Sequence, residues 1–260
     1  MTVTLASLSS AVAAPGHAVD AAVGSGMEAA ANAGPACYSR LVNEWFCTGY
    51  YIDRGDELWA ATVEHLLITC LAVVVGAALA LPLALLARSK PRLQSVVVGF
   101  STGLYTVPSL ALFPLLVPFT GLTRTTVVVG LALYSLTILV RSALDGLRSV
   151  PDEVVESARG LGYGPARLFA AVELPLALPV LFGGLRVATV STVALTTVGT
   201  LVSYGGLGDL IKDGVDNNFR AELAAASVGC VLLAVVLDLA ILALQRVATP
   251  WTRQPAEALR

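Results

Sequence analysis

Residues 156–175 read Glu-Ser-Ala-Arg-Gly-Leu-Gly-Tyr-Gly-Pro-Ala-Arg-Leu-Phe-Ala-Ala-Val-Glu-Leu-Pro. This polar, turn-rich insert interrupts a chain that is 56% hydrophobic and only 13% charged, with a mean hydropathy of +0.79. Such a composition is far from that of soluble globular proteins and indicates a membrane protein. The net charge of −2 gives no indication of nucleic-acid binding.

The insert is predicted to form a compact knob of two short helices. Pro151 suits the first turn of a helix, two acidic residues follow it, and this helix should stop at Gly162. The run from Gly162 to Pro165 predicts a turn. A second short helix is then expected over Ala166–Glu173, ended by Pro175.

The spacing within the insert resembles the cytoplasmic coupling loop of ABC importer permeases, EAA-x3-G-x9-I-x-L-P. Glu156, Ser157 and Ala158 occupy the triplet, Gly162 follows four residues after Ala158, and Pro175 closes the pattern. Ser157 for Ala and Val172 for Ile are the two departures. An ordinary amphipathic surface hairpin would not require this spacing. The resemblance implies that these residues couple the chain to an ATPase on another subunit.

Uncharged stretches predict about five membrane-spanning helices. A hydrocarbon core of ~30 Å needs about 20 residues per helix. The expected spans are Leu66–Ala87, Leu93–Thr123, Thr125–Val140 completed by Ser142–Leu144, Val187–Gly208 with a start towards Pro179, and Leu223–Gln245. The fold class expected is an all-α membrane protein, and the resemblance makes it the permease core of a type I ABC importer.

The distribution of Lys and Arg predicts the orientation. Ten basic residues fall in one set of connections, including residues 141–167 and the C-terminal segment, and five fall in the other set. The positive-inside rule then places the insert and the C-terminus in the cytoplasm and the N-terminus outside. The expected location is the plasma membrane of a prokaryote.

The chain divides into three expected parts. Residues 1–57 form an extracytoplasmic segment. Its first part is a poorly ordered tail, the result of a translation start assigned too far upstream, or a cleaved leader. Residues 58–250 form the transmembrane domain, with the coupling loop at 145–175, and residues 251–260 a cytoplasmic tail. Cys37 and Cys47 could form a disulfide outside the cell, whereas Cys70 and Cys230 are expected to be buried.

Four further stretches resemble the osmoprotectant branch of these permeases, which imports glycine betaine, choline, carnitine or proline betaine. They lie at residues 62–69, 104–113, 172–180 and 204–211. The resemblance implies a methionine-importer-like core. It also implies a homo- or heterodimer of permeases with ABC ATPase subunits and an extracytoplasmic substrate-binding protein. ATP and magnesium would bind to the ATPase, and no cofactor is expected on this chain.

Pro- and Gly-rich segments supply the candidate pathway residues. Prolines in the second span free backbone carbonyls, which a membrane tolerates beside a water-filled path or a packed neighbour. Tyr105, Pro108 and Ser109 are therefore candidate gate residues, the alternative being a simple kink. Three glycines, Gly205, Gly206 and Gly208, are candidates for docking the binding protein, with plain loop flexibility as the alternative.

Two ionisable residues are expected at similar depth in the membrane. Arg186 lies 11 residues after Pro175, and Asp238 lies 8 residues before Arg246. Charged groups at such depth usually pair or face a wet interior. We expect Arg186 and Asp238 to interact, the alternative being that each snorkels separately to the interface.

Other chemistries find little support in the sequence. Gly99–Gly103 spells G-x-S-x-G, but no strand-to-helix turn or nearby base accompanies it. No phosphate-binding G-x4-G-K-[ST] loop occurs, so the chain is expected not to be an enzyme. An importer of methionine, phosphonate or another solute is an alternative function, and an uncoupled channel or scaffold is a second. The membrane aromatics are scattered and form no evident box for a quaternary ammonium group.

Overall fold

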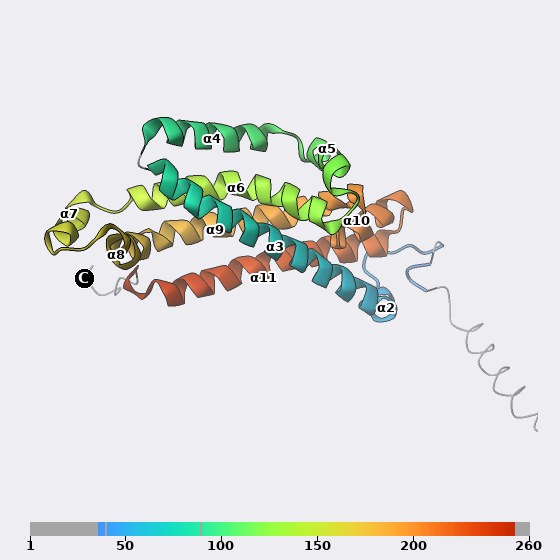
Figure 1. The fold of residues 1–260 in the computed structure, drawn as a ribbon. Helices are drawn as coiled ribbons and strands as arrows, with labels where there is room; N and C mark the ends of the chain where they lie inside the picture. The colour runs from blue at the N-terminus through green and yellow to red at the C-terminus, as the bar shows by residue number, and fades with distance from the viewer. Residues whose placement is uncertain (1–35, 40, 89, 253–260) are drawn as a thin grey trace, which may run out of the picture.

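A computed structural model describes residues 36–39, 41–88 and 90–252, and every regular element in these ranges is helical. Figure 1 shows four long helices that run side by side as the body of the structure. They are α3 (Gly55–Arg88), α6 (Arg124–Arg148), α9 (Leu174–Thr196) and α11 (Arg220–Ala248).

Shorter elements cover one side and both ends of this body (Figure 1). One end carries α7 and α8, and the opposite end carries α2 and α10. The shorter elements are α2 (Thr48–Asp53), α4 (Pro91–Thr106), α5 (Ser109–Thr120), α7 (Asp152–Gly160), α8 (Pro165–Leu168), the π-helical turn η1 (Phe169–Glu173), the 3₁₀ helix η2 (Thr197–Val202), α10 (Leu207–Asp216) and η3 (Pro250–Thr252).

Small side chains bring the central helices close together. Ala80, Ala84 and Ala87 of α3 are buried in one cluster with Leu and Val residues of α6. On the other side of α6, a Cβ at Gly184 of α9 would lie 2.2 Å from the Cβ of Ser142. Interfaces between membrane helices use small residues in this way, because close backbone approach increases van der Waals contact.

Four helical segments in the described part of the chain are long and apolar enough to cross a membrane. They are α3, α6, α11 and the segment Pro165–Val202, which includes α9. The expected second span, Leu93–Thr123, is divided into α4 and α5, which meet at an angle of 101° and make a fifth span if the bent pair is counted as one. The residue before a proline is disfavoured in the helical region. Val107 accordingly takes an extended backbone, with φ −68° and ψ 125°, before Pro108.

Pro175 does not end a helix, and that expectation is wrong. The chain continues from α8 through η1 into α9, and Pro175 lies in the first turn of α9. In η1 the backbone bonds skip one residue more than in an α-helix, as in the bond from the Leu174 N–H to the Phe169 carbonyl. Proline is tolerated in a first helical turn, where its missing N–H is not needed.

The fourth span also ends earlier than Gly208. The α-helical part stops at Thr196, η2 continues to Val202, and Ser203 takes the left-handed conformation with φ 63°. Gly208 lies in the next helix, α10. The chain thus turns back at the end of the body and places α10 against α11 and η2.

The four cysteines differ in environment. Cys37 and Cys47 form a disulfide with a Cα–Cα distance of 5.7 Å. Cys70 is exposed on α3 and Cys230 is half-buried on α11, so the expectation that both are buried is wrong for Cys70. An exposed thiol on a spanning helix faces lipid or another chain. The start of the chain and residues 253–260 lie outside the described residues.

Candidate functional site

The insert forms a knob, residues 151–173, at one end of the helical body (Figure 1). Pro151 accepts the first backbone bonds of α7 from Val154 and Val155. Two acidic side chains occupy the first turn of α7, where their negative charges interact favourably with the positive end of the helix dipole. Ala158 is the buried residue of α7, which packs against α8 and η1.

A tight turn at Gly162 joins the two arms of the knob. Gly162 has φ +83°, a conformation that favours glycine over residues with a Cβ. The Tyr163 N–H bonds to the Ala158 carbonyl at 3.1 Å and so closes the end of α7. Beyond the turn, the Arg167 guanidinium lies 4.5 Å from the centre of the Tyr163 ring. The turn is therefore fixed by its backbone and by a cation–π contact.

A partly buried ion pair ties the knob to the first long helix. The Arg88 Nη1 at the end of α3 lies 2.6 Å from the Glu173 Oε2 at the end of η1. The Glu173 side chain is only 9% exposed. Arg88 also lies 6.0 Å from the centre of the Phe169 ring. A force on the knob is thus transmitted to α3 as well as along the continuous segment into α9.

The motif residues divide into inward and outward groups. Ala158 packs inside the knob, whereas Glu156 and Ser157 on the same helix are exposed. Gly162 is exposed, and no atom lies within 4 Å of the Cβ that it lacks. Pro175 is half-buried. The exposed face of α7 is available to another protein, and the buried face holds the knob together.

The three pathway candidates lie at the bend between α4 and α5. Tyr105 is half-exposed and its ring packs edge-on against Tyr134 of α6, with 5.8 Å between ring centres. Pro108 precedes α5 as its N-cap residue, and Ser109 begins that helix. The Tyr134 hydroxyl donates a hydrogen bond to the Val107 carbonyl. This bond satisfies a backbone acceptor that the bend would otherwise leave free.

The three glycines of the outer re-entry are buried by this chain. A Cβ on Gly205 would lie 2.7 Å from the Thr200 nitrogen, and one on Gly208 would lie 2.4 Å from the Thr197 Cα. Gly206 has φ +57° and touches His65. These glycines allow close backbone packing within this chain, and docking of a binding protein at the turn that they form stays a prediction.

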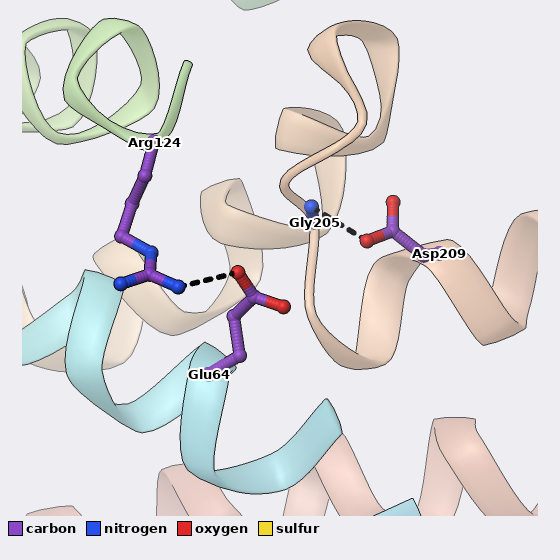
Figure 2. Close-up of polar contacts among 4 residues, drawn as sticks. All are labelled: Glu64, Arg124, Gly205 and Asp209. Carbon is purple, nitrogen blue, oxygen red and sulfur yellow. Dashed lines mark hydrogen bonds and ion pairs between the residues drawn. The ribbon is translucent and has the colours of Figure 1, made fainter. Parts of the chain in front are cut away.

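Two polar contacts hold this region together (Figure 2). The Asp209 carboxylate accepts a hydrogen bond from the Gly205 N–H at 3.0 Å, which closes the turn before α10. The Arg124 Nη2 at the start of α6 lies 3.1 Å from the Glu64 Oε1 on α3. The ion pair therefore joins the start of α6 to the N-terminal third of α3 beside the re-entrant turn.

Arg186 and Asp238 lie in direct contact between α9 and α11. The Arg186 Nε and Nη2 each donate a 2.7 Å hydrogen bond, to Oδ1 and Oδ2 of Asp238. The two side chains are 33% and 27% exposed. This paired, two-point geometry is the strong form of an Arg–carboxylate contact.

Sequence reasoning gave no role to Arg88, Glu173 or Tyr134. Arg88 is one of the basic residues that predict the orientation, and Glu173 is the last residue of the expected second helix of the knob. The signal that indicates Glu173 is a carboxylate in an otherwise apolar run beside Pro175. Its partner lies 85 residues earlier, a distance that only the packing of α3 against the knob resolves.

Comparison with known proteins relates this chain to membrane components of transporters. Residues 72–254 match the family described as binding-protein-dependent transport system inner membrane component. The carnitine transport permease protein OpuCB of Listeria monocytogenes is 32% identical over 77% of this chain and 92% of its own length. The osmoprotectant import permease protein OsmW of Salmonella typhimurium is 35% identical over 77% of this chain and 96% of its own.

Solved structures share the fold. The MetNI methionine ABC transporter in an inward-facing conformation matches with a TM-score of 0.70 at 21% identity, over 76% of this chain and 98% of that one. An amino acid ABC transporter crystallised with histidines matches with a TM-score of 0.57 at 18% identity, over 76% of this chain and 95% of that one. The expected all-α membrane fold of the ABC importer type is confirmed.

Proposed function

Because the chain belongs to the family of binding-protein-dependent transport system inner membrane components, we propose that it is the permease subunit of an ATP-driven importer of a small osmoprotectant. The substrate class is glycine betaine, choline, carnitine or proline betaine. It is supported by curated relatives that include the carnitine and osmoprotectant permeases and a choline transport system permease protein of Bacillus subtilis, which is 32% identical over 76% of this chain and 91% of its own length.

The observation that carries this proposal is the knob held to α3 by Arg88 and Glu173. An ATPase outside the membrane can move the helices of a permease only through a rigid part of the permease that projects from the membrane. The knob has a glycine turn, an internal cation–π contact and a partly buried ion pair with α3, and its outer face carries Glu156 and Ser157. Closure of a bound ATPase would move this knob and with it α3 and α9.

The partners follow from this arrangement. The knob lies in the cytoplasm, as the positive-inside rule suggests, and docks into an ABC ATPase subunit that binds ATP and magnesium. A second permease subunit, identical or homologous, completes the channel. An extracytoplasmic binding protein delivers substrate at the opposite end, where α2 and α10 lie (Figure 1).

The proposal is tested by changing the outer face and the turn of the knob. Glu156→Lys reverses a charge that we expect at the ATPase interface, and Gly162→Leu forces a side chain into a backbone with φ +83°. Both should abolish choline uptake and substrate-stimulated ATP hydrolysis in proteoliposomes that hold permease, ATPase and binding protein.

Glu44→Lys is the control, because it makes the same charge change at an exposed residue outside the knob. It should keep most of the transport activity. Survival of uptake and of stimulated hydrolysis in the Glu156→Lys, Gly162→Leu double variant would show that the knob is not the coupling element.

A further inference from the structure

A cavity of about 640 Å³ opens at the end of the body opposite the knob. It lies between the segment that includes α2 and the region where α10 meets α11. The segment before residue 72 lies outside the matched family region.

Aromatic rings form part of the lining. The rings of Tyr38, Tyr50 and Phe219 are neighbours, with centre-to-centre distances of 6.1 Å, 5.4 Å and 6.5 Å for the three pairs. All three residues line the cavity. The faces of aromatic rings attract cations, and quaternary ammonium groups are commonly bound by such groups of rings.

The charges in the lining have one prevailing sign. Three carboxylates, from Glu57, Asp213 and Glu222, line the cavity with a single guanidinium, that of Arg54. Arg54 pairs with Glu57 at 2.9 Å. The carboxylates of Asp213 and Glu222 come from α10 and α11 and leave the cavity with an excess of negative charge. Such a lining attracts a cation and repels a free anion.

Tyr50 provides a polar group that this chain leaves unused. The residue is 1% exposed and lines the cavity. Among the described residues its hydroxyl makes no hydrogen bond. Burial, with Glu222 and Glu57 close by, raises the pKa of Tyr50, so the hydroxyl stays neutral at physiological pH. The hydroxyl oxygen is not fully buried, and a polar ligand in the cavity would supply it with a hydrogen-bond partner.

The wall of the cavity that is formed by the segment including α2 is held by a disulfide and by hydrogen bonds. The Cys37–Cys47 disulfide closes the loop that carries Tyr38 and Asn43. The Tyr38 hydroxyl donates to the Asp53 Oδ2 at 2.5 Å. Asn43 bridges to the other wall: its Nδ2 donates to the Asn218 carbonyl at 2.7 Å, and its Oδ1 accepts from the Arg220 N–H at 3.0 Å. The wall is held in position before any ligand arrives, which lowers the entropic cost of binding.

We propose that this cavity is a receiving site for a small quaternary ammonium cation, with choline as the best fit, on the way from the binding protein into the pathway. The rings of Tyr38 and Phe219, which are partly exposed, contact the methylated ammonium group, and Asp213 and Glu222 balance its charge. The Tyr50 hydroxyl bonds to the polar end of the ligand. The choice of substrate class rests on the proposed function, whereas the cation site rests on the cavity itself.

Tetramethylammonium and choline are titrated by calorimetry into the full-length permease in nanodiscs, without ATPase or binding protein. We expect both to bind, and choline to bind more tightly because it also reaches the Tyr50 hydroxyl. Glu222→Gln and Asp213→Asn together, and Phe219→Leu separately, should each weaken choline binding about tenfold, as expected for the loss of a charge or cation–π contact. Tyr50→Phe should remove the preference for choline and keep tetramethylammonium binding.

Glu44→Gln is the matched control, because Glu44 is an exposed carboxylate of the same segment that does not line the cavity. It should bind choline as the unmodified chain does, and each variant is first checked for an intact disulfide and a single size-exclusion peak. Equal affinity in all variants would overturn the site, as would potassium displacing tetramethylammonium at equal concentration. Choline uptake by the reconstituted transporter is measured separately, so that a failure of the proposed function is distinguished from a failure of the site.

Discussion

At the scale of single residues, the contact between Arg186 and Asp238 is open to a direct test. Both residues lie on helices that are long and apolar enough to span a membrane. Removing one partner leaves the other charge without its counter-ion where water is scarce. Arg186→Met and Asp238→Asn should each lower the thermal stability of the assembled transporter, and the double variant should recover most of that loss. Purely additive effects in this double-mutant cycle would contradict the pairing.

The Arg88–Glu173 pair makes a different prediction, because it links knob and helix. Arg88→Met leaves the buried carboxylate of Glu173 unpaired and should destabilise the chain by about 2 kcal/mol. Basal ATP hydrolysis should remain, while stimulation by substrate and binding protein should fall. Arg92→Met, which removes a neighbouring exposed charge, is the control. Thermal unfolding and hydrolysis rates are measured on the same samples, and unchanged stimulation in Arg88→Met would rule out a role in coupling.

At the scale of elements, the bend between α4 and α5 depends on one hydroxyl. Tyr134→Phe removes the donor to the Val107 carbonyl and should cost about 1–2 kcal/mol of stability. Tyr105→Phe changes the half-exposed ring of the same aromatic pair and should have little effect. Thermal unfolding of the two variants in detergent compares them. Equal loss in both would show that the hydroxyl does not support the bend.

Sequence reasoning located the elements that local rules determine. The spans α3, α6 and α11 follow from uncharged length, and the turn of the knob follows from Gly162 and Pro165, because each depends on neighbouring residues alone. A break at Pro108 also follows from a local rule, whereas the 101° angle of the bend, the continuation through Pro175 and the burial of the re-entry glycines depend on packing between helices. The ion pair of Arg88 with Glu173 spans 85 residues of sequence and has no local signature.

At the scale of the whole molecule, the disulfide provides a test of orientation. In intact cells that express a variant with Cys70 and Cys230 replaced by serine, Cys37 and Cys47 should not react with a membrane-impermeant thiol reagent until they are reduced. After reduction both should react from outside, because the proposed orientation exposes that end to the external medium. Labelling before reduction would exclude the disulfide. Labelling only after the cells are broken would reverse the orientation.

The π-helical turn η1 also determines which side chains of the following helix, α9, face the interior. Leu168 and Glu173 are both buried, although they are five residues apart. At about 100° per residue, an unbroken α-helix would turn them about 140° away from each other. The wider turn absorbs one residue and brings both onto the inner face. Beyond it, burial of Ala177, Gly184 and Ala188 continues in that phase. Shortening this turn by one residue would rotate α9 relative to the knob by about 100° and would move its buried residues away from the inner face.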